Sequence, residues 1–329
     1  MDFKGKIILA PMAGITDYSF RKVARANGAD LCVSEMISAK AMYFKDEKTA
    51  VLASIYPDDT PIGIQIFGHE PDIMARCAME LSQNTYAHVK TSTLPSFIDI
   101  NMGCPVKKIV NNGEGSALMK SPELCEKIIS ACVKASTLPV TVKIRAGWDK
   151  EHINATEIAK IAEASGARAI TIHGRTREQM YEPYADLEII KRVKESVKIP
   201  IVGNGDITNG ASAKKMLDYT GVDSIMIGRG ALGNPFIFDE IKAYLSKKSY
   251  TCPTISQKLS VAREHVRLMV EDKGEAVAIC EARKHLAWYI KGLRGCTDIK
   301  VKINRATTLD EIEQILTEYE NRLVTDNEK

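Results

Sequence analysis

The feature that most constrains the fold of this 329-residue chain is a series of eight short apolar segments that alternate with helical patterns. These segments predict strands at residues 6–10, 31–34, 62–66, 97–100, 140–144, 169–173, 201–204 and 224–227. They are continuous apolar runs, which is typical of parallel strands that helices cover on both faces. Eight such units over roughly 235 residues match the size of a (β/α)8 barrel. We therefore predict an α/β fold built on a (β/α)8 TIM barrel.

Helical patterns fill the intervals between these segments. They predict helices over residues 17–27, 71–81, 122–135, 155–164, 187–196 and 211–217. A doubly wound open sheet is the alternative arrangement of such units. No G-x-G-x-x-G pattern follows the first predicted strand, which disfavours the dinucleotide-binding form of that sheet.

The chain changes character after the eighth predicted strand. Amphipathic patterns cover residues 255–270, 277–293 and 309–323, and no strand alternates with them. Thr308 and Glu311 have the spacing of a capping box in front of the last pattern. We therefore predict a small all-helical domain over residues 245–329, after a barrel domain over residues 1–244.

Basic charge is concentrated in one part of the chain. Residues 1–240 hold 29 Lys and Arg against 29 Asp and Glu, residues 241–305 hold 14 against 6, and residues 306–329 hold 2 against 7. Within the basic part, a spacing near seven and three residues predicts one shared helix face for Arg283, Lys284, Lys291 and Arg294. A solvated stripe is the simpler interpretation, but the local surplus favours contact with nucleic acid.

Several classes of protein are disfavoured by what the sequence lacks. No apolar run approaches the length of a membrane-spanning helix, and the N-terminal residues do not form a signal-peptide pattern. The eight cysteines include no C-x-x-C pair, which argues against a zinc ribbon. We expect a cytoplasmic protein with no membrane and no metal.

One predicted strand ends in a turn that presents a cysteine. The run 97–100 is followed by Asn101, Gly103, Cys104 and Pro105. Glycine lets the backbone turn, and proline cannot continue a strand. Most cysteines are small buried hydrophobic residues, but Cys104 at a strand tip is a candidate acid, base or nucleophile.

The active site of a (β/α)8 barrel is built at the carboxyl ends of its strands. The residues predicted at those ends are Met12, Gln65, Asn101, Cys104, Lys143, Arg145, His173, Arg175 and Asn204. They come from different strands, so we expect them to converge on one mouth. Lys143 ends a segment that should be covered on both faces, where a charge needs a partner or a ligand.

The loops after the last two predicted strands have the composition of a phosphate site. Residues 203–206 read Gly-Asn-Gly-Asp, and residues 228–230 read Gly-Arg-Gly. Glycines let backbone N–H groups approach phosphate oxygens, and this fold usually binds phosphate at these two loops. Each loop alone could be an ordinary turn, but the pair with Arg229 predicts a phosphorylated ligand.

Seven short motifs occur in one consistent order along the chain. They are Ala-Pro-Met-Ala-Gly at 10–14, Gln-Ile-Phe-Gly at 65–68, Asn-Met-Gly-Cys-Pro at 101–105, Lys-Ile-Arg at 143–145, His-Gly-Arg-Thr at 173–176, and the two loops at 203–206 and 228–230. Together they resemble the tRNA-dihydrouridine synthases, most closely the bacterial B-type branch. Residues 283–289 resemble that family's C-terminal domain. Residues 83–96 look longer than the family's usual link, which suggests an extra surface loop.

The resemblance implies a flavoenzyme with FMN across the barrel mouth. Pro11, Met12 and Ala13 would back the flavin ring. Gln65 would hydrogen-bond its pyrimidine edge, and Lys143 would lie near N1, where a cation stabilises reduced flavin. The other cofactor residues implied are His173, Asn204, Gly205, Asp206, Gly228 and Arg229.

The reaction implied by the resemblance is reduction of the C5–C6 bond of a uridine in tRNA. NADPH would reduce FMN, hydride would pass to C6, and the Cys104 thiol would protonate C5. The substrate contacts implied are Asn101, Arg145 and Arg175 at the mouth, with Arg283, Lys284, Lys291 and Arg294 on the helical domain. A stacked uridine must turn out into the pocket, and phosphate contacts would offset that cost.

Two other functions fit parts of the sequence. An FMN barrel that acts on a small molecule, such as a dihydroorotate or dihydropyrimidine dehydrogenase-like enzyme, explains the cysteine but needs no basic helical appendage. A tRNA-binding protein with an idle barrel explains the appendage, but Cys104 and Lys143 argue against it.

Overall fold

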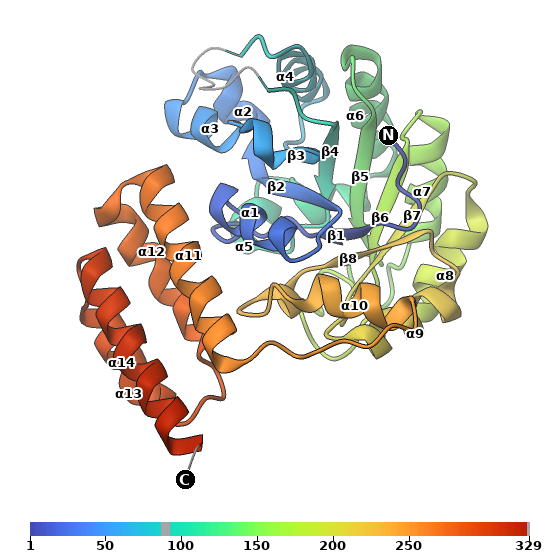
Figure 1. Ribbon diagram of the computed structural model, residues 1–329. Helices are drawn as coiled ribbons and strands as arrows, with labels where there is room; N and C mark the ends of the chain where they lie inside the picture. The colour runs from blue at the N-terminus through green and yellow to red at the C-terminus, as the bar shows by residue number, and fades with distance from the viewer. Residues whose placement is uncertain (87–92, 328–329) are drawn as a thin grey trace.

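The protein is built on one closed barrel of eight parallel strands, β1 to β8, which neighbour one another in chain order (Figure 1). The structure is a computed structural model that describes residues 1–86 and 93–327. The strands are β1 (Ile7–Leu9), β2 (Leu31–Ser38), β3 (Ile62–Phe67), β4 (Phe97–Met102), β5 (Val140–Arg145), β6 (Ala169–His173), β7 (Ile201–Asn204) and β8 (Ser224–Ile227). Because β1 pairs with both β2 and β8, the ring is closed. The predicted (β/α)8 barrel is confirmed, and the open-sheet alternative is wrong.

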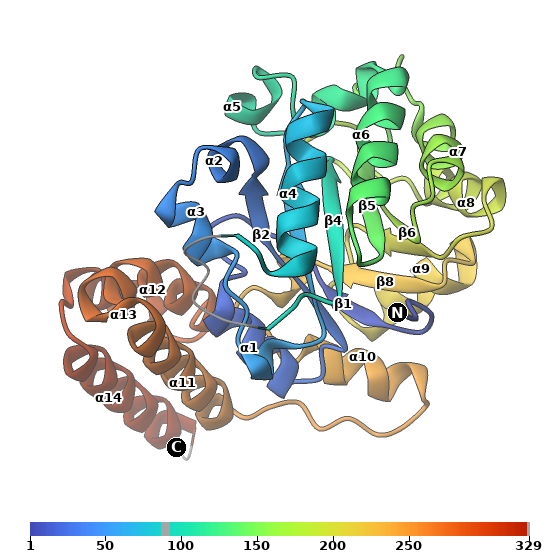
Figure 2. The ribbon, with the colours of Figure 1, turned by 90° about the horizontal axis from the view of Figure 1, so that it is seen from above.

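Helices surround the barrel on its outside (Figure 2). They are α1 (Tyr18–Ala26), α2 (Ala39–Tyr43), α3 (Glu47–Leu52), α4 (Pro71–Gln83), α5 (Lys107–Val110), α6 (Pro122–Ala135), α7 (Ala155–Ala164), α8 (Leu187–Ser196), α9 (Gly210–Thr220) and α10 (Ile237–Leu245), with 3-10 turns η1 (Pro57–Asp59), η2 (Gly115–Lys120) and η3 (Arg229–Ala231). Local sequence sets several boundaries. Asp17 caps α1 by accepting from the Phe20 N–H at 2.9 Å. Proline occupies the first turn of α4 and α6, where its missing N–H costs nothing.

Side chains close the barrel interior at the amino ends of the strands. A buried cluster there consists of Phe3, Ile8, Ala10, Leu31, Val33, Phe97, Ala169, Val202 and Met226. Phe3 and Phe97 pack edge to face with ring centroids 5.2 Å apart. The cavity of the barrel lies at the carboxyl ends, where Ala10 and Met226 of this cluster line it.

Four helices follow the barrel: α11 (Ile255–Lys273), α12 (Glu275–Tyr289), α13 (Cys296–Arg305) and α14 (Leu309–Asn327). They enclose their own hydrophobic cluster, which includes Leu259, Leu286 and Leu316. The prediction of one helix over 277–293 is wrong at its end, because α12 stops at Tyr289 and a turn leads into α13, which was not predicted. None of the helices in the described part of the chain is long and apolar enough to span a bilayer.

The helical region packs against α1 of the barrel (Figures 1 and 2). The Phe20 ring stacks on the His265 ring at a centroid distance of 5.4 Å. Lys273 forms an ion pair with Asp17 beside this stack. The two hydrophobic clusters are therefore joined by both aromatic and charged contacts.

Candidate active site

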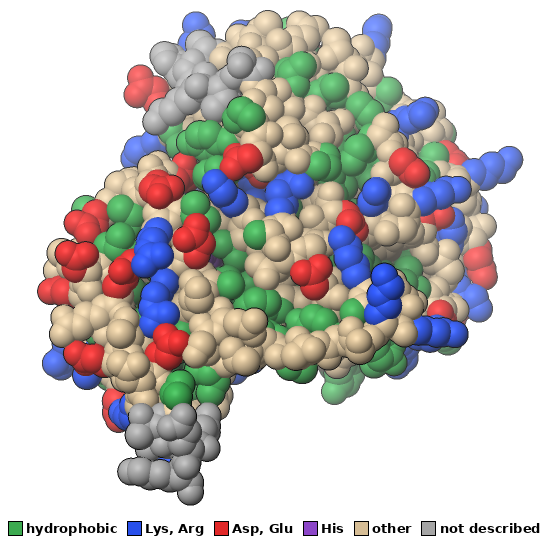
Figure 3. Space-filling view, in the orientation of Figure 1, with side chains coloured by type: hydrophobic (Ala, Val, Ile, Leu, Met, Phe, Trp, Pro, Cys, Tyr) green, Lys and Arg blue, Asp and Glu red, His purple; other side chains and the backbone are tan. Residues whose placement is uncertain are grey.

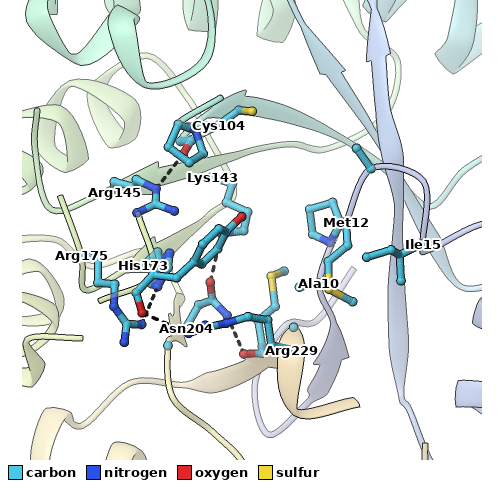
Figure 4. A pocket seen from close by; sticks show the side chains of 18 of the residues that line it. Ala10, Met12, Ile15, Cys104, Lys143, Arg145, His173, Arg175, Asn204 and Arg229 are labelled. Atoms are coloured by element: carbon cyan, nitrogen blue, oxygen red, sulfur yellow. Dashed lines mark hydrogen bonds between the residues drawn. The ribbon is translucent and has the colours of Figure 1, made fainter. Parts of the chain in front are cut away.

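The carboxyl ends of the strands surround a cavity of about 710 Å³. The predicted mouth and cofactor residues that line it are Pro11, Met12, Ala13, Gln65, Asn101, Cys104, Lys143, Arg145, His173, Arg175, Asn204, Gly205, Asp206, Gly228 and Arg229. Figure 4 shows labelled side chains around this cavity that come from the ends of β5, β6 and β7 and from the segments after β1, β4, β6 and β8. The expected convergence on one mouth is thus observed, because parallel strands of a barrel all end on the same rim.

Lys143 projects from β5 into a buried part of the wall. Its Nζ donates to Asn204 Oδ1 at 3.1 Å, and Asn204 Nδ2 donates to the Met226 carbonyl at 2.8 Å. Burial and the nearby Arg145 charge lower the pKa of Lys143 to about 8. A half-buried ammonium that lines the cavity and donates to a neutral amide is suited to an anionic or electron-rich ligand.

Arg145 and Arg175 line the cavity while they also hold its loops together. Arg145 donates to the Gly103 carbonyl at 2.8 Å and to the Thr176 and Met180 carbonyls at 2.8 and 2.9 Å. The Arg175 guanidinium donates to the Asp206 carboxylate at 2.8 Å. These two arginines therefore fix the loops after β4, β6 and β7, and any substrate contact comes in addition to that.

His173 lies between positive charges at the end of β6. Burial, followed by the charges of Arg145, Lys143, Arg175 and Arg229, holds the pKa of His173 well below its usual range. The imidazole is therefore neutral at physiological pH. Its Nε2 lies 3.3 Å from Arg175 Nη1, which can only donate, so the ring proton belongs on Nδ1.

The two glycine loops after β7 and β8 pack closely together. Gly205 has φ +128°, and a Cβ there would meet Ala185 Cβ at 2.5 Å. A Cβ on Gly230 would meet the Ile207 carbonyl oxygen at 2.2 Å. Arg229 extends beside these loops with its side chain 49% exposed. Arg229 thus lies beside the two loops at the predicted phosphate position, with its Nη2 3.6 Å from Asp206 Oδ1.

Cys104 is half-buried in the turn after β4. Its N–H donates to Asn101 Oδ1 at 2.9 Å, and its carbonyl accepts from the Ser116 N–H and hydroxyl at 3.1 and 2.9 Å. Burial raises the pKa of the Cys104 thiol, so the thiol is protonated at neutral pH. The predicted proton donor therefore has the protonation state that the role requires.

Tyr181 and Asp99 are two polar residues near the cavity to which the sequence analysis gave no role. Tyr181 lines the cavity, with Arg229 Cζ at 4.8 Å from its ring centroid. Asp99 lies on β4 and is only 2% exposed. An acidic residue within an apolar strand could have indicated this site from the sequence, because a buried carboxylate needs hydrogen-bond donors around it. Tyr181 sits in an irregular loop, and nothing in the local pattern marked it.

The four predicted tail residues do not share one helix face. Arg283 and Lys284 lie on α12, whereas Lys291 and Arg294 follow its last residue, Tyr289. Gly292 and Gly295 adopt φ of +84° and +69°, which ends the helical course that the spacing assumed.

The two tail residues on α12 also have partners within the protein. Arg283 donates to the Ala306 carbonyl at 3.0 Å, and Lys284 donates to the Gly14 carbonyl of the barrel. Lys and Arg side chains intermingle with Asp and Glu over the face of the molecule that Figure 3 shows. The predicted basic stripe of these four residues is therefore not formed, and on the face shown the basic side chains lie among acidic ones.

The described residues offer no ready metal site, since no group of three His, Cys, Asp or Glu side chains lies together among residues 1–86 and 93–327. The absence of a metal remains an expectation. The segment 83–96 begins in α4, and its residues 87–92 lie outside the described part of the chain, so the expected extra loop also remains a prediction.

Comparison with known proteins identifies the family. A family model described as dihydrouridine synthase (Dus) matches residues 8–324. The chain belongs to the dihydrouridine synthase family. A probable tRNA-dihydrouridine synthase of Rickettsia conorii is 43% identical over 306 residues, 92% of this chain and 90% of that protein. The tRNA-dihydrouridine synthase B of Pasteurella multocida is 41% identical over 327 residues, 99% of this chain and 96% of that protein.

Relatives named for the B-type branch confirm the resemblance drawn from the motifs, and that of Pseudomonas aeruginosa is 37% identical over 321 residues, 96% of this chain and 94% of that protein. Among solved structures, histamine dehydrogenase from Rhizobium sp. 4-9 has a TM-score of 0.52 at 13% identity. That match covers 80% of this chain and 49% of the other. At 13% identity, this match supports the barrel fold of this chain and nothing further.

Proposed function

We propose that this dihydrouridine synthase reduces uridine in tRNA to 5,6-dihydrouridine, with FMN as its cofactor and NADPH as the reductant. The observation that carries the proposal is the arrangement of Cys104, Lys143 and the two glycine loops around one cavity. Relatives named tRNA-dihydrouridine synthase support tRNA as the substrate. A cytoplasmic location follows from that substrate.

The residues of the cavity fit FMN. A volume of about 710 Å³ lies within the usual range of cofactor pockets. The loops at Gly205 and Gly228 with Arg229 suit the phosphate, and Pro11, Met12 and Ala13 offer a wall for the ring. Arg175 Nε is buried without a hydrogen-bond partner in the described part of the chain, so a donor is available to a ligand.

FMN, when bound, supplies a carrier that takes two electrons from NADPH and passes a hydride to uridine C6. In this proposal Lys143 stabilises negative charge on the flavin, and Gln65 and His173 hold its edge. Cys104 donates its thiol proton to uridine C5, on a base that Asn101, Arg145 and Arg175 help to hold. Each step uses the protonation state favoured at the site, since the thiol carries its proton and the imidazole is neutral.

We assign tRNA binding to the helical domain, residues 245–329, and catalysis to the barrel, residues 1–244. Lys291 and Arg294 would contact the tRNA backbone, and so would Arg283 and Lys284 in addition to their contacts with the Ala306 and Gly14 carbonyls. Such contacts would offset the cost of turning a uridine out of its stack.

Three measurements on purified protein test the proposal. The wild-type protein should carry FMN, oxidise NADPH when tRNA lacking dihydrouridine is added, and form dihydrouridine in that tRNA. Free uridine or orotate should not replace tRNA as the electron acceptor. Protein without flavin, or turnover on the free pyrimidines but not on tRNA, would contradict the proposal.

The phosphate site is tested separately with Arg229→Ala. Loss of one half-exposed charged contact should weaken FMN binding by about tenfold. Arg168→Ala, at an exposed arginine just before β6, is the matched control and should keep wild-type affinity. Equal FMN affinity in both variants would show that the loops are ordinary turns.

A further inference from the structure

A buried carboxylate lies at the start of a hydrogen-bond chain beside the cavity. Asp99 Oδ1 accepts from the Thr141 hydroxyl at 2.6 Å, and Asp99 Oδ2 accepts from Gln65 Nε2 at 2.7 Å. The three residues sit on adjacent strands at matching register, Gln65 opposite Asp99 and Asp99 opposite Thr141. The strand pairing therefore holds the donors on the carboxylate.

The chain continues from Gln65 to the turn that carries Cys104. Gln65 Oε1 accepts from Asn101 Nδ2 at 2.7 Å. Asn101 Oδ1 then accepts from the backbone N–H groups of Gly103 and Cys104 at 3.1 and 2.9 Å. Every step from the carboxylate to the turn is one direct hydrogen bond.

The direction of this chain follows from its two ends. A carboxylate oxygen facing an amide accepts, so Gln65 must turn its NH2 group to Asp99 and its oxygen to Asn101. At the other end, two backbone N–H groups require the oxygen of Asn101. Both amides thus have one orientation that satisfies all their neighbours.

Burial makes the other orientations costly. Asp99 is 2% exposed, Gln65 1% and Asn101 6%. A reversed amide would set oxygen against oxygen or nitrogen against nitrogen with no water to compensate. Burial raises the pKa of Asp99, against the hydrogen bonds from Thr141 and Gln65. A proton on Oδ1 would leave Oδ2 accepting from Gln65, so the orientation does not depend on that titration.

We infer that Asp99 is a positioning residue that fixes the orientation of both cavity amides, Gln65 and Asn101, and through Asn101 the backbone of Cys104. Within residues 1–86 and 93–327, one N–H of Gln65 has no acceptor and remains for a ligand. The second N–H of Asn101 has there only the weak acceptor Met36 Sδ, at 3.5 Å. A ligand edge read by these two side chains must therefore present acceptors such as carbonyl oxygens. That this edge belongs to flavin or uridine rests on the proposed function.

The inference is tested by moving the carboxylate from position 99 to position 101, at the other end of the hydrogen-bond chain. Asn101→Asp alone places a carboxylate on each side of Gln65, so that one of them faces the Gln65 oxygen. Asp99→Asn together with Asn101→Asp keeps the same atoms and charge and lets Gln65 turn over. In the double variant the hydrogen bonds from Thr141 through Gln65 to the Cys104 turn can all form again, with the amide of Gln65 turned over.

The wild type, Asp99→Asn, Asn101→Asp and the double variant form a double-mutant cycle. Their thermal and urea unfolding can be measured without flavin or tRNA. Asn101→Asp should raise the unfolding equilibrium constant at least tenfold more in the wild-type background than in the Asp99→Asn background. Thr141→Val with Asn101→Asp is the matched control, because it removes a donor from Asp99 but cannot reverse Gln65, and it should show no rescue.

Each outcome of the cycle is decisive. Recovery in the double variant supports the inference, including the case in which Asn101→Asp alone does not fold and the double variant does. Additive losses, or a double variant that does not fold, would overturn it. Because unfolding is measured without substrate, failure of the proposed reaction would not be mistaken for failure of this inference.

Discussion

Lys143 is a half-buried cation that lines the cavity and donates to a neutral amide, so its role depends on which ligand the cavity binds. If it stabilises reduced flavin, Lys143→Ala should lower the FMN reduction potential by about 30 mV or more, which for a two-electron couple is ~1.4 kcal/mol. Reduction of FMN by NADPH should slow as well. Spectroelectrochemistry and anaerobic rapid mixing measure the two effects, and an unchanged potential would remove Lys143 from the flavin site.

Cys104 should act in only one of the two half-reactions. Cys104→Ala should bind FMN and tRNA and accept electrons from NADPH at near the wild-type rate. Oxidation of its reduced flavin by tRNA should slow by about 10²–10⁴-fold, the usual contribution of a positioned acid. Cys104→Ser should stay impaired, because a hydroxyl is a much weaker acid than a thiol.

Rapid mixing of each half-reaction provides the control for the Cys104 variants. A cysteine that only fills space would tolerate alanine with a modest loss of stability and normal turnover per folded molecule. Normal oxidation of the reduced flavin by tRNA in Cys104→Ala would therefore contradict its assignment as proton donor.

At the scale of elements, the helices with long amphipathic patterns were predictable from sequence. α6, α7 and α8 have the bounds that the pattern predicted. The short helices α2, α3 and α5 were missed, because helices of this length take their stability from packing, which the local sequence does not encode. The pattern after Glu275 was extended too far, since apolar spacing continued through a turn.

The same distinction applies to the site. Strand ends converge by a rule of the fold, so residues such as Gln65, Lys143 and Asn204 could be placed at the mouth from sequence. The role of Asp99 depends on donors from two neighbouring strands, Gln65 on β3 and Thr141 on β5. That register becomes known only when the strands are paired.

The contact between α1, α11 and α12 buries two histidines. His265 and His285 are 0% and 2% exposed, with ring centroids 4.6 Å apart. Burial lowers the pKa of His265 to about 4 and that of His285 to about 3, with Asp17 opposing the shift and Lys273 adding to it. Both imidazoles are neutral in the folded protein.

This pair should make stability fall as the solution becomes acidic. Below pH about 6.5 the two histidines are protonated in the unfolded chain but remain neutral in the folded protein. The free energy of unfolding therefore decreases as pH falls from 6.5 toward 4. The slope is about 1.4 kcal/mol per pH unit for each histidine. Urea unfolding between pH 4 and 7 measures it.

A substitution separates this effect from general acid denaturation. His285→Phe should reduce the slope of unfolding free energy against pH between pH 4 and 6.5 by about 1.4 kcal/mol per pH unit and leave the slope due to His265. His152→Phe is the matched control, because His152 is exposed and paired with Asp149. If His285→Phe keeps the wild-type slope, the buried pair does not govern acid stability.

At the scale of the whole molecule, the tail charges divide into two on α12 and two that follow it. Lys291→Ala with Arg294→Ala should weaken tRNA binding and reduce the slope of log affinity against log salt by about one to two. Arg283→Ala should instead lower the unfolding temperature, since it removes a contact with the Ala306 carbonyl. Filter binding over a salt series would show an unchanged slope if Lys291 and Arg294 do not contact the tRNA.

The central claim is that one cavity couples bound flavin to a uridine held in tRNA. It is tested most directly by reducing the FMN of the wild-type protein without oxygen and then mixing it rapidly with tRNA that lacks dihydrouridine. We predict rapid return of the oxidised flavin absorbance with one dihydrouridine formed per flavin, and no such return with free uridine at the same concentration. Flavin that stays reduced in the presence of tRNA, or that is reoxidised without dihydrouridine formation, would contradict the account.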